Sequence, residues 1–300
     1  MNIVRIGTRG SPLALTQAEM VRRQLGAADP NLTVELVTIA TSGDRVRGAL
    51  REHGGKFLYV KEIEEALLAG TVDLAVHSMK DLPGELPDGL AIVAVMERDD
   101  PRDALVTRGV EGLAALPAGA RIGTSSLRRQ WQVLSLRPDC AVVPVRGNVG
   151  TRVRKLIAGE FDALVMAAAG LKRLGIKEPH ITPITTTELL PAIGQGAIVV
   201  EGRRSDDELA AFVRLACHHM PTGIATTAER AVLRAVGGDC FTPLAAHAEL
   251  EGHALRLRGW LATADGTRAV RAERSASIGQ DVEAAATLGR AVGEELKVAL

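Results

Sequence analysis

Aromatic side chains are scarce in this 300-residue sequence, and neither sign of charge prevails. Phe, Trp and Tyr make up 2% of the residues, so a core must be built mainly from Leu, Val, Ile and Ala. Lys plus Arg and Asp plus Glu number 36 each, which argues against a general nucleic-acid-binding protein. We therefore expect no nucleic-acid partner, although a local basic pocket remains compatible with this balance.

Cysteines are also few. Cys140, Cys217 and Cys240 are odd in number and far apart, so no disulfide framework is recognisable and a reducing cytosol fits best. The first residues lack the pattern of a signal peptide, and no run approaches the roughly 18 unbroken apolar residues of a membrane span. These absences predict a soluble, cytoplasmic protein with no membrane partner.

The first hundred residues alternate between strand-like and helix-like segments. Ser11 and Pro12 are suited to the N-cap and the first position of a helix. The alternation predicts an α/β domain with a mostly parallel sheet, in which residues 32–40 form a central strand. The strands are expected at residues 2–7, 32–40, 72–76 and 90–96, and the helices at residues 13–25 and 59–70.

A charged connector, residues 97–103, predicts a domain boundary. A second alternation of strands and helices follows it and predicts a second α/β domain. After about residue 218 the pattern changes to a helix, three strands at hairpin spacing and a last helix at residues 281–298. This end piece is typical of an α+β domain.

The stretch "TVDLAVHSMKDLPGELP" begins as a buried strand and ends in Lys80 and Asp81. Pro83 and Pro87 prevent further pairing, so both charges lie where the strand gives way to a loop. Burying two charges is costly unless they are paired or used, which makes them candidate functional residues.

A basic segment follows in the second domain. In "RIGTSSLRRQ" a strand leads through Thr124 and Ser125 into a helix whose first turn holds Arg128 and Arg129, an arrangement that favours an anion site. The alternative is that Ser126 only caps the helix while the arginines face solvent. Residues 121–155 contain eight Arg or Lys and one acid, which predicts a basic cleft at the strand ends.

The ligand of such a cleft should be polyanionic. "VRGNVGTR" contributes Arg146, Gly147 and Arg152, and "GTRGSPLAL" contributes Arg9 and Ser11. No Walker or dinucleotide-binding pattern is present, so carboxylates are favoured over nucleotides.

Three further segments leave alternatives open. Lys56 in "HGGKFLYVKE" fits a flexible surface loop and an anion-contacting loop about equally. His218 and His219 in "CHHMP" are more typical of a helix end than of a metal site. Cys240 in a glycine-rich loop could be inert, a nucleophile or a point of covalent attachment.

Several of these motifs occur together in a known family. "GTRGSPLALTQA", "DLAVHSMKDLP", "GTSSLRRQ", "RGNVGTRVRKL", "LPAIGQGAI" and "GGDCFTPLAAHAEL" resemble the porphobilinogen deaminase (hydroxymethylbilane synthase) family, from about residue 3 to the C-terminus. The resemblance implies two α/β domains of the periplasmic-binding-protein type and a small C-terminal α+β domain. Their boundaries would be residues 1–96 with 196–216, residues 97–195, and residues 217–300.

The resemblance also implies an activity. Such a transferase deaminates and joins four porphobilinogens head to tail on a dipyrromethane primer and releases hydroxymethylbilane and ammonia, in tetrapyrrole and haem biosynthesis. Cys240 would hold the primer covalently, and a monomer is expected. Asp81 would be the catalytic acid, stabilising the cation left by loss of ammonia.

The same resemblance implies which residues form the site, and it implies no metal site. Cofactor-binding residues would be Lys80, Asp81, Thr124, Ser125, Arg128, Arg129, Arg146, Gly147 and Cys240. Substrate-binding residues would be Arg9, Ser11, Lys56, Arg152, Arg173 and Gln195.

The sequence departs from the family pattern at two places. Phe57 and Tyr59 stand where a glycine and a phenylalanine are usual, and "GGDC" replaces "GGC". Other classes compatible with two lobes around a basic cleft are a carboxylate receptor without catalytic activity and the effector domain of a transcription regulator. A phosphate-handling enzyme would need a Walker loop or clustered metal-binding carboxylates, and neither is visible.

Overall fold

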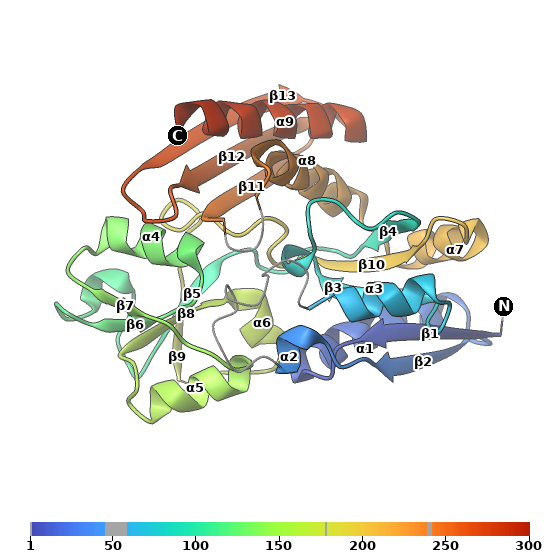
Figure 1. Cartoon of the computed structure of the whole chain (residues 1–300), viewed down its shortest axis with the longest axis horizontal. Coiled ribbons are helices and arrows are strands. Elements are labelled where there is room, and N and C mark those ends of the chain that lie inside the picture. The colour runs from blue at the N-terminus through green and yellow to red at the C-terminus, as the bar shows by residue number, and fades with distance from the viewer. Residues whose placement is uncertain (1, 46–58, 178, 239–241) are drawn as a thin grey trace.

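The computed structural model describes residues 2–45, 59–177, 179–238 and 242–300. Within these ranges the strands form two five-stranded sheets and one three-stranded sheet. In Figure 1 the first sheet lies on the right, the second on the left and the third at the top. The predicted fold class, two α/β domains and a small α+β domain, is confirmed.

The first sheet has the order β2-β1-β3-β10-β4. β1 runs parallel to β2 and β3, whereas β10 runs antiparallel to β3 and β4. β1, β2, β3 and β4 therefore run in the same direction, in agreement with the predicted mostly parallel sheet, and only β10, which returns from a distant part of the chain, runs the opposite way. The strands are β1 (Ile3–Thr8), β2 (Thr33–Thr38), β3 (Leu74–Ser78), β4 (Leu90–Val95) and β10 (Ile198–Arg203).

β2 is an edge strand, not the predicted central strand. Val34 and Leu36 pack against the core, while Thr33, Glu35 and Thr38 remain in contact with solvent. The alternation of apolar and polar residues in β2 therefore matches its half-exposed position, whereas the apolar run at the C-terminal end of residues 32–40 does not.

Helices cover both faces of this sheet. α1 (Pro12–Ala28) and α7 (Asp207–Cys217) share one apolar cluster with the strands, and α3 (Lys61–Leu68) packs on the other face. The predicted start of α1 is confirmed: the Ser11 Oγ accepts a hydrogen bond from the Ala14 N–H at 3.3 Å. A short helix, α2 (Ser42–Arg45), follows β2.

The second sheet repeats this plan in the order β7-β6-β8-β5-β9. β6 is parallel to β7 and β8, and β5 is antiparallel to β8 and β9. Its strands are β5 (Asp103–Thr107), β6 (Arg121–Gly123), β7 (Ala141–Val143), β8 (Ala163–Ala167) and β9 (His180–Pro183). Its helices are α4 (Leu127–Leu136), α5 (Val149–Ile157) and α6 (Ala168–Arg173).

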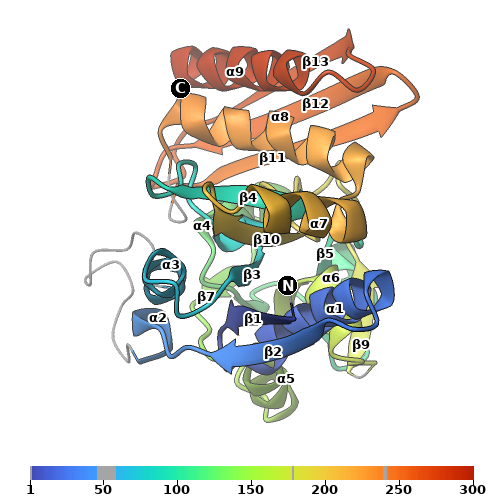
Figure 2. The ribbon, with the colours of Figure 1, turned by 90° about the vertical axis from the view of Figure 1, so that its right-hand side faces the viewer.

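The third sheet is an antiparallel meander of β11 (Leu244–Glu251), β12 (Ala254–Ala262) and β13 (Ala269–Ser277). α8 (Met220–Val236) and α9 (Val282–Ala299) lie side by side on one of its faces (Figures 1 and 2). Gly289 permits their close approach, because a Cβ there would lie 2.2 Å from the Ala228 carbonyl oxygen.

The chain passes from the first sheet to the second near residues 97–103 and returns before β10. The domain boundaries given above stay a prediction. Among the described residues, no helix has the length and apolar character needed to cross a membrane.

Candidate active site

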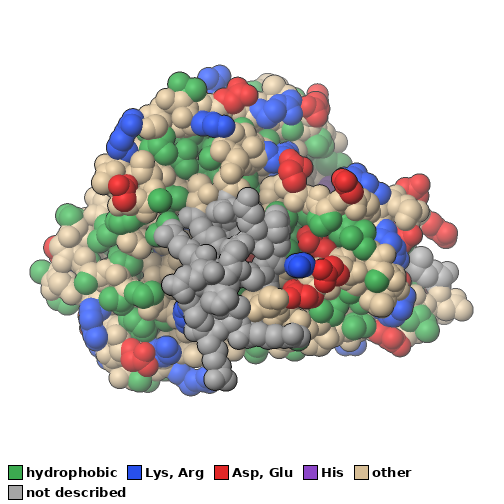
Figure 3. Space-filling view, in the orientation of Figure 1, with side chains coloured by type: hydrophobic (Ala, Val, Ile, Leu, Met, Phe, Trp, Pro, Cys, Tyr) green, Lys and Arg blue, Asp and Glu red, His purple; other side chains and the backbone are tan. Residues whose placement is uncertain are grey.

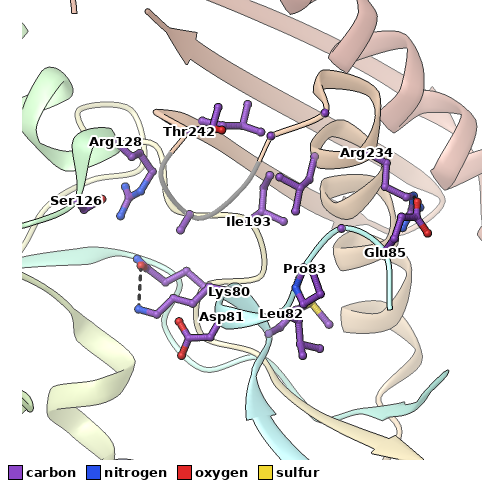
Figure 4. Close-up of a pocket in the computed structure, with 18 of the residues that line it drawn as sticks. Lys80, Asp81, Leu82, Pro83, Glu85, Ser126, Arg128, Ile193, Arg234 and Thr242 are labelled. Carbon is purple, nitrogen blue, oxygen red and sulfur yellow. Dashed lines mark hydrogen bonds and ion pairs between the residues drawn. The ribbon is translucent and has the colours of Figure 1, made fainter. Parts of the chain in front are cut away.

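A cavity of about 420 Å³, here called the first cavity, lies where the three sheets meet (Figure 4). Its walls come from the 3₁₀ turn η2 (Met79–Asp81), the start of α4, the segment 192–195 and the C-terminal end of α8. Lys80, Asp81, Arg128, Arg129 and Gln195 all line it. The structure thus brings together five of the residues predicted from the sequence.

Lys80 and Asp81 reach the first cavity because β3 ends directly before them. The Met79 N–H donates to the Ala197 carbonyl at 3.0 Å and the Leu82 N–H to the Met79 carbonyl at 3.0 Å, which fixes the turn. Both charged side chains are half-buried. No hydrogen bond from a described residue reaches the Asp81 carboxylate, which Figure 4 shows beside Lys80.

The Lys80 ammonium donates a long hydrogen bond of 3.5 Å to the Gln195 Oε1. Burial and the neighbouring Arg129 lower the pKa of Lys80 to about 8, although Asp81 and Asp103 oppose this shift. Lys80 is therefore still mostly charged at neutral pH, at one wall of the cavity.

Arg128 and Arg129 are both buried and share one carboxylate, Asp103, at the start of β5. The Arg128 Nη1 donates to the Asp103 Oδ2 at 2.7 Å, and the Arg129 Nη2 donates to the Asp103 Oδ1 at 2.8 Å. Burial alone would raise the pKa of Asp103, but the two guanidiniums outweigh it and hold that pKa well below its usual range. The alternative of solvent-facing arginines is therefore wrong.

The positive charge of residues 121–155 is partly offset in the folded protein by acidic side chains from outside this segment. Asp162, outside that window, lies 3.7 Å from both Arg108 and Arg121, and Glu160 lies 3.8 Å from Lys155. Over the face seen in Figure 3, acidic and basic side chains occur in small mixed groups. Of the eight basic residues in this segment, only Arg128 and Arg129 line the first cavity.

Gln195, which is fully buried, connects the two α/β parts. Its Nε2 donates to the Pro101 carbonyl at 2.8 Å and to the Asp103 Oδ1 at 3.0 Å. The Gln195 backbone carbonyl accepts a hydrogen bond from the Arg98 Nε at 2.8 Å. Sequence reasoning missed Asp103 and Arg98, and the only available signal was an acid at the start of the apolar run "DALVT".

Arg173 does not line the first cavity. Its Nη2 donates to the Gly196 carbonyl at 2.6 Å, its Nε lies 3.7 Å from Asp99, and burial lowers its pKa. It therefore supports the returning segment.

The predicted residues of the loops after β6 and β7 do not line the first cavity. The Ser125 Oγ donates to the Val145 carbonyl at 2.8 Å, and the Thr124 Oγ accepts from the Ser126 N–H at 3.2 Å. Arg146 is exposed. Gly147 has φ 105°, a conformation that favours glycine, and its carbonyl accepts from the Arg152 Nε at 2.7 Å.

Arg152 lies within electrostatic reach of the turn η2 and of α4. Burial and Arg129 lower its pKa, while Tyr59 and Asp81 raise it, so all three groups lie within electrostatic reach. Tyr59 in turn carries the Arg9 guanidinium 4.2 Å above its ring centroid, a cation–π contact. Ser11, predicted as a substrate contact, has its hydroxyl engaged as the cap of α1.

Cys240, Lys56 and Phe57 lie outside the described residues. Gly238 and Thr242, the described residues nearest to Cys240 on either side, both line the first cavity. Cys140 and Cys217 are buried, and burial raises the pKa of the Cys217 thiol to about 12, which makes it a poor nucleophile.

The two adjacent histidines have structural partners. The His218 Nδ1 accepts from the Val95 N–H at 3.1 Å, and the His219 side chain caps α8. No group of three or more His, Cys, Asp or Glu that could hold a metal occurs in the described part of the chain.

Comparison with known families decides the relationship. A family profile described as "Porphobilinogen deaminase, dipyromethane cofactor binding domain" matches residues 4–211, and one described as "Porphobilinogen deaminase, C-terminal domain" matches residues 224–298. The chain belongs to the porphobilinogen deaminase family.

Curated relatives agree over almost the whole chain. The porphobilinogen deaminase of Syntrophobacter fumaroxidans is 48% identical over 295 residues, which cover 98% of this chain and 94% of the relative. That of Geobacter sulfurreducens is 48% identical over 297 residues, 99% of this chain and 92% of the relative. The resemblance identified from the sequence motifs is thereby confirmed.

Solved structures with a related arrangement include a Salmonella typhimurium periplasmic binding protein of high arginine specificity. The two chains are 13% identical, their alignment covers 72% of this chain and 92% of the binding protein, and the TM-score is 0.44. A LysR-family transcriptional regulator is 16% identical, covers 72% of this chain and 70% of that chain, and has a TM-score of 0.46. Neither likeness bears on what this chain binds.

Proposed function

We propose that this protein is a transferase that joins four porphobilinogens head to tail, with loss of ammonia, and releases hydroxymethylbilane. The observation that carries the proposal is the first cavity, where the Asp81 carboxylate stands without a hydrogen bond from any described residue among cationic side chains. Membership of the porphobilinogen deaminase family supports the same reaction.

The donor set of the site fits ligands with several carboxylates, because each pyrrole of such a chain carries an acetate and a propionate. Guanidiniums, an ammonium and hydroxyls are the groups that bind carboxylates through charge-assisted hydrogen bonds. We propose that a dipyrromethane attached to Cys240 is held by Lys80, Thr124, Ser125, Arg128, Arg129, Arg146 and Gly147. We propose that incoming substrate is held by Arg9, Lys56, Arg152 and Gln195, while Ser11 and Arg173 support substrate binding by holding the start of α1 and the returning segment in place.

The dipyrromethane, when bound, supplies the pyrrole carbon to which the first substrate is joined. Attachment through Cys240 is supported by its neighbours in sequence, since Gly238 and Thr242 line the same cavity as Asp81. Cys140 and Cys217 are buried within the first two α/β units and do not line that cavity.

Asp81 has two tasks in this proposal. In porphobilinogen the bond between the methylene carbon and the amine nitrogen breaks, the amine leaves as ammonia with an added proton, and a delocalised cation remains. A fixed carboxylate next to the pyrrole N–H stabilises that cation. Asp81 can also move the proton that the accepting pyrrole carbon loses when the new carbon–carbon bond forms.

Asp103 prepares the arginines for this chemistry. Its four short contacts from Arg128, Arg129 and Gln195 hold the guanidiniums in place before any ligand arrives. Substrate carboxylates then bind to cations that are already ordered, which lowers the entropy cost of binding.

We further propose a cytoplasmic monomer with the domain boundaries predicted above. Free, buried Cys140 and Cys217 are compatible with a reducing compartment.

The test is an Asp81→Asn variant. Turnover of porphobilinogen should fall about 10²- to 10⁴-fold, the usual contribution of a positioned acid–base group. The dipyrromethane should be retained, which the colour reaction with acidic dimethylaminobenzaldehyde reports. Asp207→Asn, an exposed carboxylate on α7, is the matched control and should keep wild-type turnover. Wild-type turnover in Asp81→Asn would contradict the assignment.

A further inference from the structure

A second cavity of about 520 Å³ adjoins the first on the other side of the segment that follows Asp81. Its walls come from this segment, β4, the end of α7 and α8. The two cavities share four lining residues, Met79, Gly84, Glu85 and Arg234. They are therefore neighbouring compartments around one loop.

The second cavity is basic. Its walls hold four arginines, Arg204, Arg214, Arg230 and Arg234, against two acids, Glu85 and Asp88. The side chains of Arg204 and Arg214 are exposed, and neither makes an ion pair with a described residue. These two guanidiniums can bind an anion without breaking an existing pair.

Arg230 joins the second cavity to the segment that follows Asp81. It is only 6% exposed, and its Nη2 donates to the carbonyls of Pro83 at 2.8 Å and Gly84 at 3.0 Å. Its Nη1 is buried and has no hydrogen-bond partner among the described residues. A buried guanidinium with unused donors is the kind of group that a carboxylate would satisfy.

Two of the four shared lining residues, Glu85 and Arg234, form a side-chain pair. The Arg234 Nε lies 3.7 Å from the Glu85 Oε1, and the Glu85 side chain is 83% exposed. Figure 4 shows the two side chains facing each other at the edge of the first cavity. An exposed ion pair at this distance contributes little and separates easily.

The proposed reaction creates a need for such space. The bond-forming step stays at Asp81 while the product grows by one pyrrole at each cycle, so the rings added earlier must move away from Asp81. The first cavity has the size of a site for a single drug-sized ligand, and a chain of several pyrroles is larger. Each displaced ring carries two carboxylates that need cationic partners.

We propose that the second cavity receives the older rings of the growing polypyrrole, whose acetate and propionate groups bind Arg204, Arg214 and Arg230 after the Glu85–Arg234 pair opens. This inference rests on the proposed function. The arginines of the first cavity then serve the ring that reacts, and those of the second serve the rings that have reacted.

The experiment compares the mass ladders of enzyme intermediates. Protein carrying the dipyrromethane is mixed with limiting porphobilinogen, quenched, and its intact mass measured to count added units. In an Arg204→Ala/Arg214→Ala variant, the first addition should match wild type. The ratio of protein with three added units to protein with one should fall at least about tenfold, which is the effect of losing a single charge-assisted contact.

Two further variants keep the test specific. Arg23→Ala/Arg271→Ala removes two exposed arginines outside both cavities and should give the wild-type ladder. Arg204→Lys/Arg214→Lys keeps the charges and should restore much of the ratio. An Ala variant with an unchanged ladder, or one blocked at the first addition, would overturn the inference. A wild-type protein with no ladder would instead refute the proposed function.

Discussion

At the scale of single residues, the candidate site depends on one carboxylate that belongs to none of the motifs. Asp103 is fully buried and receives donors from Arg128, Arg129 and Gln195. It compensates the burial of two adjacent guanidiniums that would otherwise repel each other. The sequence therefore predicts where the arginines are, and the structure explains why they can be there.

Replacing this carboxylate should be costly. We expect Asp103→Asn to lower the free energy of unfolding by about 3 to 5 kcal/mol at pH 7, because it leaves buried guanidiniums without their counter-charge. Since the pKa of Asp103 is lowered by folding, its contribution is present above the unfolded value of about 4 and is lost as pH falls further. Urea unfolding at pH 7 and pH 3.5 measures both effects.

Asp162→Asn is the control for that measurement. Asp162 also lies near two arginines, at 3.7 Å, but its side chain is 34% exposed, so the change should stay below about 1 kcal/mol. Equal effects for the two variants would show that Asp103 has no special role.

At this scale the sequence predicts features that depend on neighbouring residues in the chain, and it does not predict contacts between distant ones. Lys80, Asp81, Arg128 and Arg129 were found because a charge beside an apolar run is visible in the sequence. Asp103 was missed as their partner because the contact joins residues 25 and 26 positions apart and depends on how β5 and α4 pack. The polarity of a residue is readable, but its tertiary partner is not.

At the scale of secondary-structure elements, helix α3 covers a buried polar group on one face of the first sheet. Glu64 from α3 is 4% exposed, and the His77 Nε2 lies 3.3 Å from the Glu201 Oε2. Burial, followed by the charge of Glu201, raises the pKa of Glu64 from 4.5 to about 7. The folded state therefore favours the neutral form of Glu64.

This shift predicts a pH-dependent stability. A raised carboxyl pKa means that stability is complete below about pH 4.5 and is lost as pH rises through 7. We expect Glu64→Gln to be more stable than wild type at pH 8, by as much as about 3 kcal/mol, and equal to it near pH 4.5. Urea unfolding at the two pH values gives the difference.

Glu65→Gln tests the neighbouring position. The Glu65 side chain is 60% exposed and lies 3.8 Å from the Lys61 Nζ, so this change should have little effect at either pH. If the gain from Glu64→Gln were the same at both pH values, the altered titration of Glu64 would be disproved.

The positions of helices and strands along the chain were predicted better than the directions in which the strands pair. Ser11 and Ser126 capping the helices after them was readable, because capping is a local interaction. That β10 lies antiparallel between β3 and β4 was not readable, because hydrophobic periodicity is the same for a strand running either way. The edge position of β2 also depends on which strands pair across the sheet.

At the scale of the whole molecule, the three sheets are joined at the site by buried charges. The Arg98 Nη1 donates to the Glu229 Oε1 at 2.6 Å, and Glu229 also accepts from the N–H groups of Gly194 and Ala248. These contacts tie the connector after β4, the segment before β10 and the third sheet to α8. The first cavity therefore lies at a junction whose walls come from all three parts.

The central claim is that this junction holds a covalent dipyrromethane on Cys240, next to Asp81. The most direct measurement is the intact mass of the purified protein beside its Cys240→Ser variant. We predict that wild type exceeds its sequence mass by two porphobilinogen units less two ammonias and that the variant does not. A wild-type protein that stays at its sequence mass after incubation with porphobilinogen, or a variant with the same excess as wild type, would contradict the account.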